Sequence, residues 1–279
     1  MPKIASALVV ALLAAAPQTL TPDNQPADPF KIADNLYYVG SSDIASYLIT
    51  TLDGHLLIDG GYPETAALIR ANVGKLGFEM RDIKILLNTQ AHFDHAGGFA
   101  ELKRLTGARM MASEQDARIL ESGGHGDFYF GDSALFPAVT VDRRLTNGDQ
   151  VRLGSTVLTA HLTPGHTKGC TTWTWDARDR GRPYHVVVLC GLTILEGTNV
   201  NGMATYPEIK RDYQRTYEIL KALPCDIFLG AHASYYGGMK KAAEMRSHPD
   251  GPNPFIDSDG YRAYVDGAEK RFRDHLNQR

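Results

Sequence analysis

Two features are missing from this 279-residue sequence: a long hydrophobic run and a block of basic residues. The most apolar stretch, residues 4–16, is shorter than the roughly 20 residues that a membrane-spanning helix needs. The formal net charge of -3 at pH 7, without any Lys/Arg-rich block, argues against nucleic-acid binding. We therefore expect neither a nucleic-acid partner nor a membrane-embedded part.

The apolar stretch instead has the proportions of a secretion signal. It follows the weakly basic start MPK and ends in three alanines, residues 14–16, which suit signal cleavage. We expect a signal peptide over residues 1–19, a disordered, proline-containing leader over residues 20–29, and export to the periplasm. A buried N-terminal helix is the alternative for the apolar stretch.

Cysteine is scarce, with three residues in the whole chain. Their spacing does not match the C-x₂₋₄-C pairs of a cysteine zinc site. Cys170 and Cys190 lie near two strand-like segments, TTWTW and HVVVL, which would be neighbours in a sheet. In an oxidising compartment we expect a Cys170–Cys190 disulfide, which leaves Cys225 over.

The remaining pattern indicates a layered α/β fold. Short apolar or alternating runs such as ASYLITT, IKILLN and YHVVVLCG read as strands, and segments such as PEIKRDYQRTYEILKAL read as amphipathic helices. Strands and helices are mixed in both halves of the chain, which favours sheets inside and helices outside. Without a linker between the halves, we expect one domain over residues 30–279.

The segment NTQAHFDHAGG concentrates possible metal ligands within four residues. His92, Asp94 and His95 follow an apolar strand, and alone they would be read as a chance cluster or a hydrogen-bonding turn. Two further histidines, His166 in LTPGHTKG and His232 in IFLGAH, also stand where a strand passes into a loop. Loops at strand ends are where a rigid scaffold presents functional side chains, so the five residues together predict a metal site.

With these ligands in view, the sequence resembles the metallo-β-lactamase superfamily, whose signature is H-x-H-x-D-H followed by single distant histidines. It looks most like subclass B3 of the class B β-lactamases, through the segments LLIDGGYP, HFDHAGGFAELKRLTGA, FYFGD, TPGHTKGCTTWTW and ALPCDIFLGAH. The resemblance runs from about residue 32 to the C-terminus. It implies a four-layer αβ/βα sandwich of two mixed sheets, with up to two Zn²⁺ ions at the edge between them.

Transferred by position, the first zinc site of that family falls on Gln90, His92 and His166. The second zinc site falls on Asp94, His95 and His232, and this set suits Zn²⁺ with room for a water. Gln90 is where the sequence departs, because an amide oxygen donates less to zinc than an imidazole nitrogen. We expect the first site to be weakened and the second to fill first.

The resemblance implies a hydrolase that opens the β-lactam amide of penicillins, cephalosporins and carbapenems by attack of a zinc-bound hydroxide, and so confers resistance. Asp94 would be catalytic, as the ligand that orients the hydroxide. Thr193, Asn201 and Tyr129 are candidate substrate contacts, although Thr193 is equally a turn cap and Tyr129 equally packs its loop. Gly191 stands where relatives often carry serine, so one anchor for the substrate carboxylate is missing.

Two other functions remain open from the sequence. The same cage serves other superfamily hydrolases, such as lactonases and thioester hydrolases, because the ligands fix metal-assisted hydrolysis but not the substrate. A non-catalytic zinc-binding scaffold is the third possibility, with Gln90 as a mark of decay, and the intact second site argues against it. The absence of G-x-S-x-G and S-x-x-K motifs agrees with a reaction that needs no protein nucleophile. We expect the protein to be a monomer.

Overall fold

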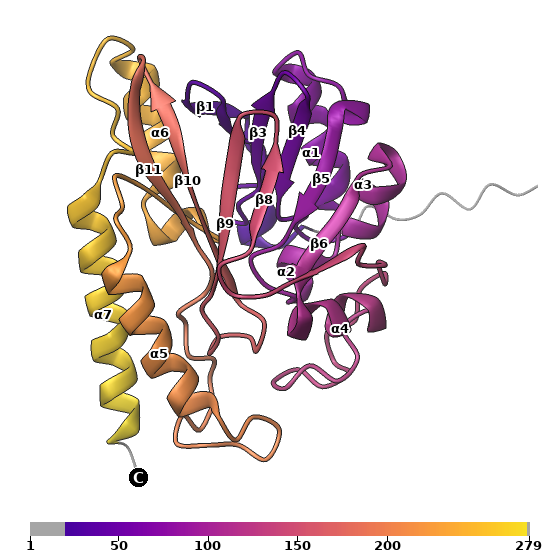
Figure 1. The fold of residues 1–279 in the computed structure, drawn as a ribbon, viewed down its shortest axis with the longest axis vertical. Helices are drawn as coiled ribbons and strands as arrows, with labels where there is room; N and C mark the ends of the chain where they lie inside the picture. The colour runs from indigo at the N-terminus through magenta and orange to yellow at the C-terminus, as the bar shows by residue number, and fades with distance from the viewer. Residues whose placement is uncertain (1–19, 278–279) are drawn as a thin grey trace, which may run out of the picture.

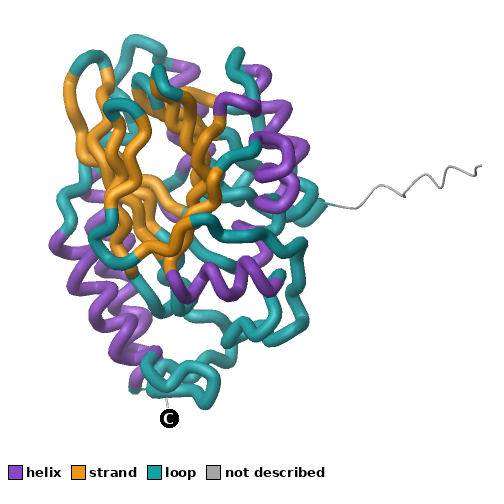
Figure 2. Tube along the Cα trace, turned by 45° about the vertical axis from the view of Figure 1, so that its right-hand side comes forward, coloured by secondary structure: helices purple, strands orange, loops and turns teal. Residues whose placement is uncertain are grey.

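The computed structural model describes residues 20–277, so the expected signal peptide over residues 1–19 lies outside the described residues. Two β-sheets face each other, and helices cover their outer surfaces (Figure 1). The tube in Figure 2 shows the same order, with the strands gathered in the interior and the helices at the periphery. The αβ/βα sandwich expected from the sequence is confirmed. Within residues 20–277, no helix combines the length and apolar character needed to cross a bilayer.

The first sheet contains seven strands that follow the order of the chain. They are β1 (Phe30–Ala33), β2 (Leu36–Tyr38), β3 (Tyr47–Thr51), β4 (Gly54–Ile58), β5 (Ile83–Leu87), β6 (Arg109–Ser113) and β7 (Arg143–Leu145). Strands β1 to β4 pair antiparallel through short turns. Strands β4 to β7 pair parallel, which requires long crossover connections between them.

The second sheet contains five strands in the order β12-β11-β10-β9-β8. They are β8 (Gln150–Leu153), β9 (Thr156–Leu162), β10 (Thr171–Asp179), β11 (Arg182–Leu189) and β12 (Ile227–Gly230). Only the pairing of β11 with β12 is parallel. The helix α5 therefore lies in the crossover between these two strands.

The helices form the two outer layers. The α-helices are α1 (Thr65–Lys75), α2 (Phe93–Ala96), α3 (Phe99–Thr106), α4 (Glu114–Ser122), α5 (Ile209–Ala222), α6 (Gly238–Ser247) and α7 (Ser258–Leu276), and the 3₁₀ helices are η1 (Pro22–Asn24), η2 (Met80–Asp82) and η3 (Ala233–Tyr235). Helices α1, α3 and α4 flank the first sheet, and α5 and α7 flank the second (Figure 1). The sequence pattern did not predict α6.

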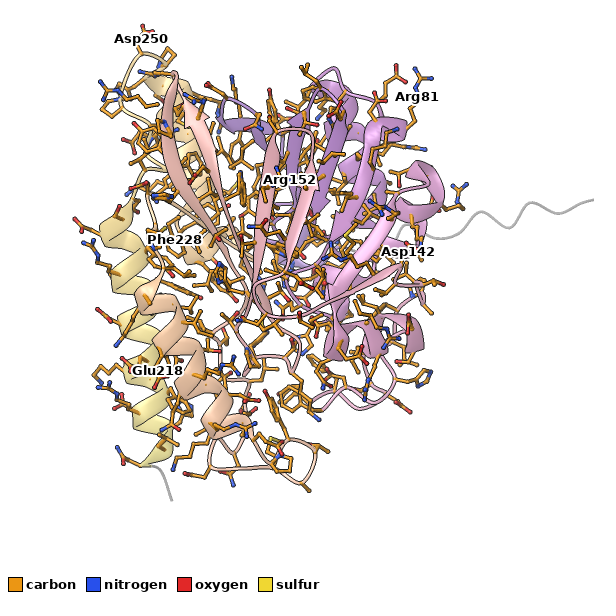
Figure 3. The ribbon with its side chains drawn as sticks, viewed as in Figure 1. Arg81, Asp142, Arg152, Glu218, Phe228 and Asp250 are labelled. Atoms are coloured by element: carbon orange, nitrogen blue, oxygen red, sulfur yellow. A yellow bond between two sulfur atoms is a disulfide. The ribbon has the colours of Figure 1, made fainter. Side chains whose placement is uncertain are left out.

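Apolar side chains fill both sides of the first sheet, because it has a sheet on one face and helices on the other. Neighbouring residues of a strand point to opposite faces, so Leu56 lies in the core between the sheets while Leu57 lies under the helices. Phe228 is buried on the second sheet, whereas Glu218 of α5 is exposed (Figure 3). The two buried faces explain why the strands read as continuous apolar runs.

The expectation of a disordered leader over residues 20–29 was wrong. These residues contain η1, and Asn24 is buried. Its side-chain amide donates to Glu64 at 3.1 Å and its side-chain oxygen accepts from Thr65 at 2.8 Å. A polar, proline-containing composition indicated disorder, but here the polar side chains are used in specific hydrogen bonds to the first sheet's helical layer.

Candidate metal centre

The candidate ligands come from three connections at one edge of the sandwich. The first group follows β5, His166 lies between β9 and β10, and His232 directly follows β12. Asp94 and His95 lie on the short helix α2, which His92 precedes as its N-cap, rather than on the loop that the sequence suggested. The next helix, α3, has Gly98 as its N-cap. A side chain at Gly98 would overlap the carbonyl oxygen of Gly60, so glycine lets this turn approach the first sheet.

The structure brings together the three residues predicted for the second site. One ligand atom from each of Asp94, His95 and His232 lies within 4.8 Å of the other two. The Nε2 atoms of His95 and His232 are 3.2 Å apart, and Oδ2 of Asp94 lies 3.2 Å from the former and 3.7 Å from the latter. These three atoms converge as the ligands of one metal ion would.

Two carboxylates lie next to the Nδ1 atoms of the histidines of the second site. Nδ1 of His95 lies 3.6 Å from Oδ2 of Asp59, and Nδ1 of His232 lies 3.0 Å from Oδ2 of Asp43. A carboxylate behind a histidine fixes the tautomer and the ring orientation of a metal ligand. Both Nε2 atoms are consequently directed into the cluster.

The electrostatics of the second site favour a cation. Burial lowers the pKa of His95, but the charges and hydrogen bonds of Asp94 and Asp59 outweigh it and raise this pKa to about 10. Burial opposes ionisation of Asp94, yet the neighbouring imidazoles hold its pKa well below the usual range. A positive charge between these residues is thus strongly favoured, and a metal cation would displace the proton that supplies it without metal.

The first site brings together His92 and His166, whose ring centroids are 4.8 Å apart. Nδ1 of His166 lies 2.7 Å from the carbonyl oxygen of Thr193, and Nε2 of His92 lies 3.6 Å from Oδ2 of Asp127. Burial lowers the pKa of both rings, that of His166 to about 4 and that of His92 well below its ordinary value. Both are therefore neutral imidazoles at pH 7, the form that ligates metal.

Gln90 is completely buried, and neither its side-chain oxygen nor its side-chain nitrogen has a hydrogen-bond partner within residues 20–277. Leaving a buried polar group unpaired costs about 1–3 kcal/mol. A cation held with His92 and His166 would satisfy the amide oxygen. The position expected to carry the third ligand of the first site therefore holds a buried amide whose oxygen is unpaired.

Three carboxylates beside the ligands were missed by reading the sequence. Asp59 ends the LLIDGG run with φ of 62° and accepts two hydrogen bonds from Thr89, both at 2.7 Å. Asp127 lies in the aromatic loop, the segment of residues 125–137 between α4 and β7, and Asp43 lies in the turn before β3. A non-glycine residue with positive φ is uncommon and worth attention. Of the three carboxylates, only Asp59 had a signal in the sequence, namely its place at the end of a strand.

The three candidate substrate contacts, Thr193, Tyr129 and Asn201, have different hydrogen-bond partners. Thr193 is exposed, and its carbonyl oxygen is the partner of His166. The hydroxyl of Tyr129 donates to the carbonyl oxygen of Glu196 at 2.9 Å and so joins two loops. Asn201 donates to the carbonyl oxygen of Leu276 at 3.4 Å, at the end of α7, and no hydrogen bond within the described residues joins it to a metal ligand.

A disulfide and a glycine lie beside His166. Cys170 and Cys190 form the expected disulfide with a Cα–Cα distance of 5.8 Å, while Cys225 is free. A side chain at Gly191, the residue after this disulfide, would overlap Cδ2 of the His166 ring. Glycine rather than serine at position 191 therefore leaves the imidazole its space.

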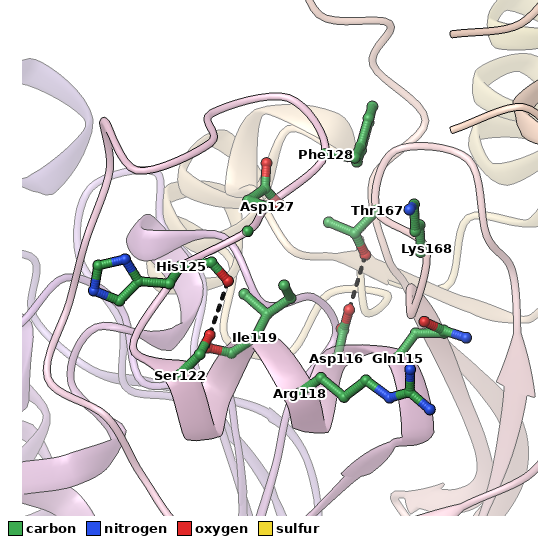
Figure 4. Close-up of a pocket in the computed structure, with 11 residues that line it drawn as sticks. Gln115, Asp116, Arg118, Ile119, Ser122, His125, Asp127, Phe128, Thr167 and Lys168 are labelled. Carbon is green, nitrogen blue, oxygen red and sulfur yellow. Dashed lines mark hydrogen bonds between the residues drawn. The ribbon is translucent and has the colours of Figure 1, made fainter. Parts of the chain in front are cut away.

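A cavity of about 360 Å³ adjoins the first site, lined by residues of α4, the aromatic loop and the loop after His166. Asp116 lines this cavity and accepts a hydrogen bond from Thr167 at 3.2 Å (Figure 4). It also accepts one from Asn88 at 2.9 Å. Burial raises the pKa of Asp116 to about 7. Asp127, the partner of His92, lines the same cavity.

Imidazoles and a carboxylate converging at one edge of an αβ/βα sandwich define a metal-dependent hydrolase. The sequence model of the metallo-beta-lactamase superfamily matches residues 40–232, a range that contains all six predicted ligands. The chain belongs to the metallo-β-lactamase superfamily. This fold implies a metal, typically zinc.

Among solved structures, the chain is similar to native FEZ-1 metallo-beta-lactamase from Legionella gormanii, with 41% identity, a TM-score of 0.89, and coverage of 92% of this chain and 98% of that one. BJP-1, a subclass B3 metallo-beta-lactamase of Bradyrhizobium japonicum, matches with 41% identity, a TM-score of 0.85 and coverage of 91% and 95%. The class B3 di-zinc metallo-beta-lactamase LRA-12 from an Alaskan soil metagenome matches with 38% identity, a TM-score of 0.87 and coverage of 94% and 99%.

Among curated proteins, the chain is similar to a hydroxyacylglutathione hydrolase of Methylobacterium sp. (strain 4-46). The identity is 29% over 191 residues, which is 68% of this chain and 62% of that relative. The chain thus spans less than two thirds of that relative's length, whereas its likeness to the solved B3 β-lactamases covers nearly the whole of both chains.

Proposed function

We propose that this protein is a zinc-dependent β-lactamase of subclass B3 that hydrolyses the amide bond of penicillins, cephalosporins and carbapenems and so confers resistance. The observation that carries the proposal is the likeness to FEZ-1, at 41% identity over 92% of this chain and 98% of that chain. A likeness over nearly the whole of both chains supports the substrate class better than the ligands alone, which fix metal-assisted hydrolysis but not the substrate.

In this proposal the second zinc site is Asp94, His95 and His232, and the first is Gln90, His92 and His166. Bound zinc supplies a Lewis acid and lowers the pKa of a water from about 15.7 towards 7. Asp94 would orient the attacking water through its carboxylate, and the carbonyl oxygen of Thr193 would keep the imidazole of His166 in position.

The proposal places the mature enzyme in the periplasm. The Cys170–Cys190 disulfide supports this placement, because structural disulfides persist in oxidising compartments and are rare in reducing ones. Cell fractionation of a producing strain, with detection of the processed chain, measures it. Protein found unprocessed in the cytoplasm would contradict both the export and the cleavage near residue 19.

The second candidate is a thioester hydrolase, and it rests on the similarity to hydroxyacylglutathione hydrolase. The decisive experiment assays the purified mature protein on a penicillin, a cephalosporin, a carbapenem and a hydroxyacylglutathione over a range of zinc concentrations. We expect turnover of the lactams, loss of that turnover on chelation and its return with zinc. Turnover of the thioester without turnover of any lactam would replace the first proposal by the second.

The Asp94→Asn variant is the matched control for this assay, because it keeps the size of the side chain and removes the charge. Loss of activity with an unchanged melting temperature would assign the turnover to this site. If neither substrate class is turned over at any zinc concentration, both proposed activities are refuted.

We further propose that the second site fills before the first. Metal analysis after dialysis is expected to give about one zinc per chain, because only the first site carries an amide ligand. Two zinc ions retained per chain after dialysis would refute this order.

A further inference from the structure

The side chain of Asp43 lies next to Nδ1 of His232. Oδ2 of Asp43 lies 3.0 Å from Nδ1 of His232, and Oδ1 accepts the backbone N–H of Ser234 at 2.7 Å. The carbonyl oxygen of Asp43 accepts the N–H of Ala233, also at 2.7 Å. Asp43 therefore holds the ring of His232 and the backbone that follows it at the same time.

This arrangement determines which nitrogen of His232 is available to a metal. A carboxylate at Nδ1 favours the tautomer with the proton on that atom, which leaves the lone pair on Nε2. Nε2 is the atom that lies 3.2 Å from Nε2 of His95 and 3.7 Å from Oδ2 of Asp94. Without Asp43, the ring would be free to rotate and to exchange tautomers.

Asp43 in turn depends on the N-terminal segment, Thr21–Gln25. The carbonyl oxygen of Asp23 accepts the N–H groups of Asp43 at 2.9 Å and of Ile44 at 3.3 Å. The same oxygen accepts the hydroxyl of Ser41 at 3.0 Å. Ser42 forms three further bonds with the segment, through its own N–H and its hydroxyl.

The N-terminal segment is fixed on its other side to the beginning of α1. The side chain of Asn24 bonds to Thr65 at 2.8 Å and to Glu64 at 3.1 Å. The hydroxyl of Tyr62 donates to Oδ2 of Asp23 at 3.0 Å. The segment thus contacts the beginning of α1 on one side and the turn Ser41–Ile44 on the other. Through Asp43 in that turn, it is connected to His232, which follows β12.

We propose that Asp43 is a positioning residue for the second zinc site and that the N-terminal segment holds it in position. Residues 21–25 are then part of the metal-binding unit, although they lie far from every ligand in the sequence. This inference rests on the metal site of the proposed function and is independent of the substrate.

The test measures metal binding without substrate, so that its failure is separate from a failure to find β-lactamase activity. Zinc affinity is obtained by competition with a chromogenic chelator, and the visible spectrum of bound Co²⁺ reports the ligand geometry. Loss of a partner behind a ligand lowers metal affinity by about 10- to 100-fold. We expect a loss of that size for Asp43→Ala, with a changed Co²⁺ spectrum, and a smaller loss for Asp43→Asn, whose amide oxygen still accepts from Nδ1.

Two further variants separate positioning from general stability. Asp28→Ala removes an exposed aspartate of the same region that pairs only with Lys75, and we expect wild-type affinity. Asn24→Ala removes two of the side-chain bonds between the N-terminal segment and the beginning of α1, and we expect a loss in the same direction as Asp43→Ala but smaller. Wild-type affinity and spectrum in both Asp43 variants would overturn the role of Asp43, and wild-type affinity in Asn24→Ala would overturn that of the segment. If Asp43→Ala fails to fold, Asp43→Asn decides the first question.

Discussion

Gln90 differs from the other five proposed ligands in having a neutral amide oxygen to offer a metal. Replacing it by histidine supplies an imidazole nitrogen, a stronger donor to zinc. We expect Gln90→His to raise the zinc affinity of the first site by about tenfold or more, and zinc titration followed by metal analysis measures this. The exposed Gln214 of α5 provides the control Gln214→His, which should leave the stoichiometry unchanged. Equal affinity in Gln90→His and the wild type would mean that position 90 is not a ligand position.

Gly191 lies next to the ring of His166, and its lack of a side chain leaves space for that ring. Because a Cβ there would overlap the ring of His166, Gly191→Ser must displace that ring and its bond to Thr193. We expect zinc affinity at the first site to fall by about tenfold, the lower end for losing a partner of a ligand, while the second site is unaffected. Gly74→Ala is the matched control, since a Cβ at Gly74 meets nothing within 4 Å. A serine variant that binds zinc like the control would show that the ring has room to move.

At the scale of elements, the Cys170–Cys190 disulfide joins the beginning of β10 to the end of β11, beside the loop that carries His166. The two cysteines are separated by 20 residues, and closing a loop of that length stabilises the fold by about 3 kcal/mol in the chain-entropy model. Urea unfolding of the metal-free protein with and without a reductant should show a difference of this size. Cys225→Ala should leave that difference unchanged, because Cys225 is free. Superimposable curves with and without the reductant would refute the stabilising role.

Helix α2 shows how far element assignment from the sequence reached. Its four residues were read as a loop, because so short a helix has no periodicity to detect, yet the strand before it was recognised as β5. The choice of candidate ligands did not depend on this assignment, since it rested on residue type and on nearby strand ends. Helix α6 was missed for a related reason: few of its residues are buried, so an apolar face hardly appears in its sequence.

At the scale of the whole molecule, buried Asp116 links stability to pH. Burial raises its pKa in the folded protein to about 7 from the ordinary value of 3.8, so the folded state binds this proton more tightly than the unfolded state. The free energy of unfolding should therefore fall as pH rises from about 4 to about 7, and this contribution should stay constant above pH 7. The full shift corresponds to at most about 4 kcal/mol.

The variant Asp116→Asn removes this titration. We expect its stability relative to the wild type to rise between pH 5 and pH 8, by up to about 4 kcal/mol over the full titration. Urea unfolding at both pH values, with the two proteins at the same zinc saturation, measures the difference. A constant difference between the two proteins across this range would show that Asp116 does not titrate there.

The sequence predicted the fold class, the candidate ligands and the disulfide, because strand patterns, residue types and cysteine positions can be read along the chain. Apolar runs define strands, and strand-end histidines and one aspartate define a metal site. The positions of Asp43 and Asp127 were decided only by the tertiary structure. Asp43 and His232 are 189 residues apart, and their contact exists only because the two sheets meet at one edge. The same folding turns the polar residues 21–25, which alone read as disordered, into a hydrogen-bonded part of that edge.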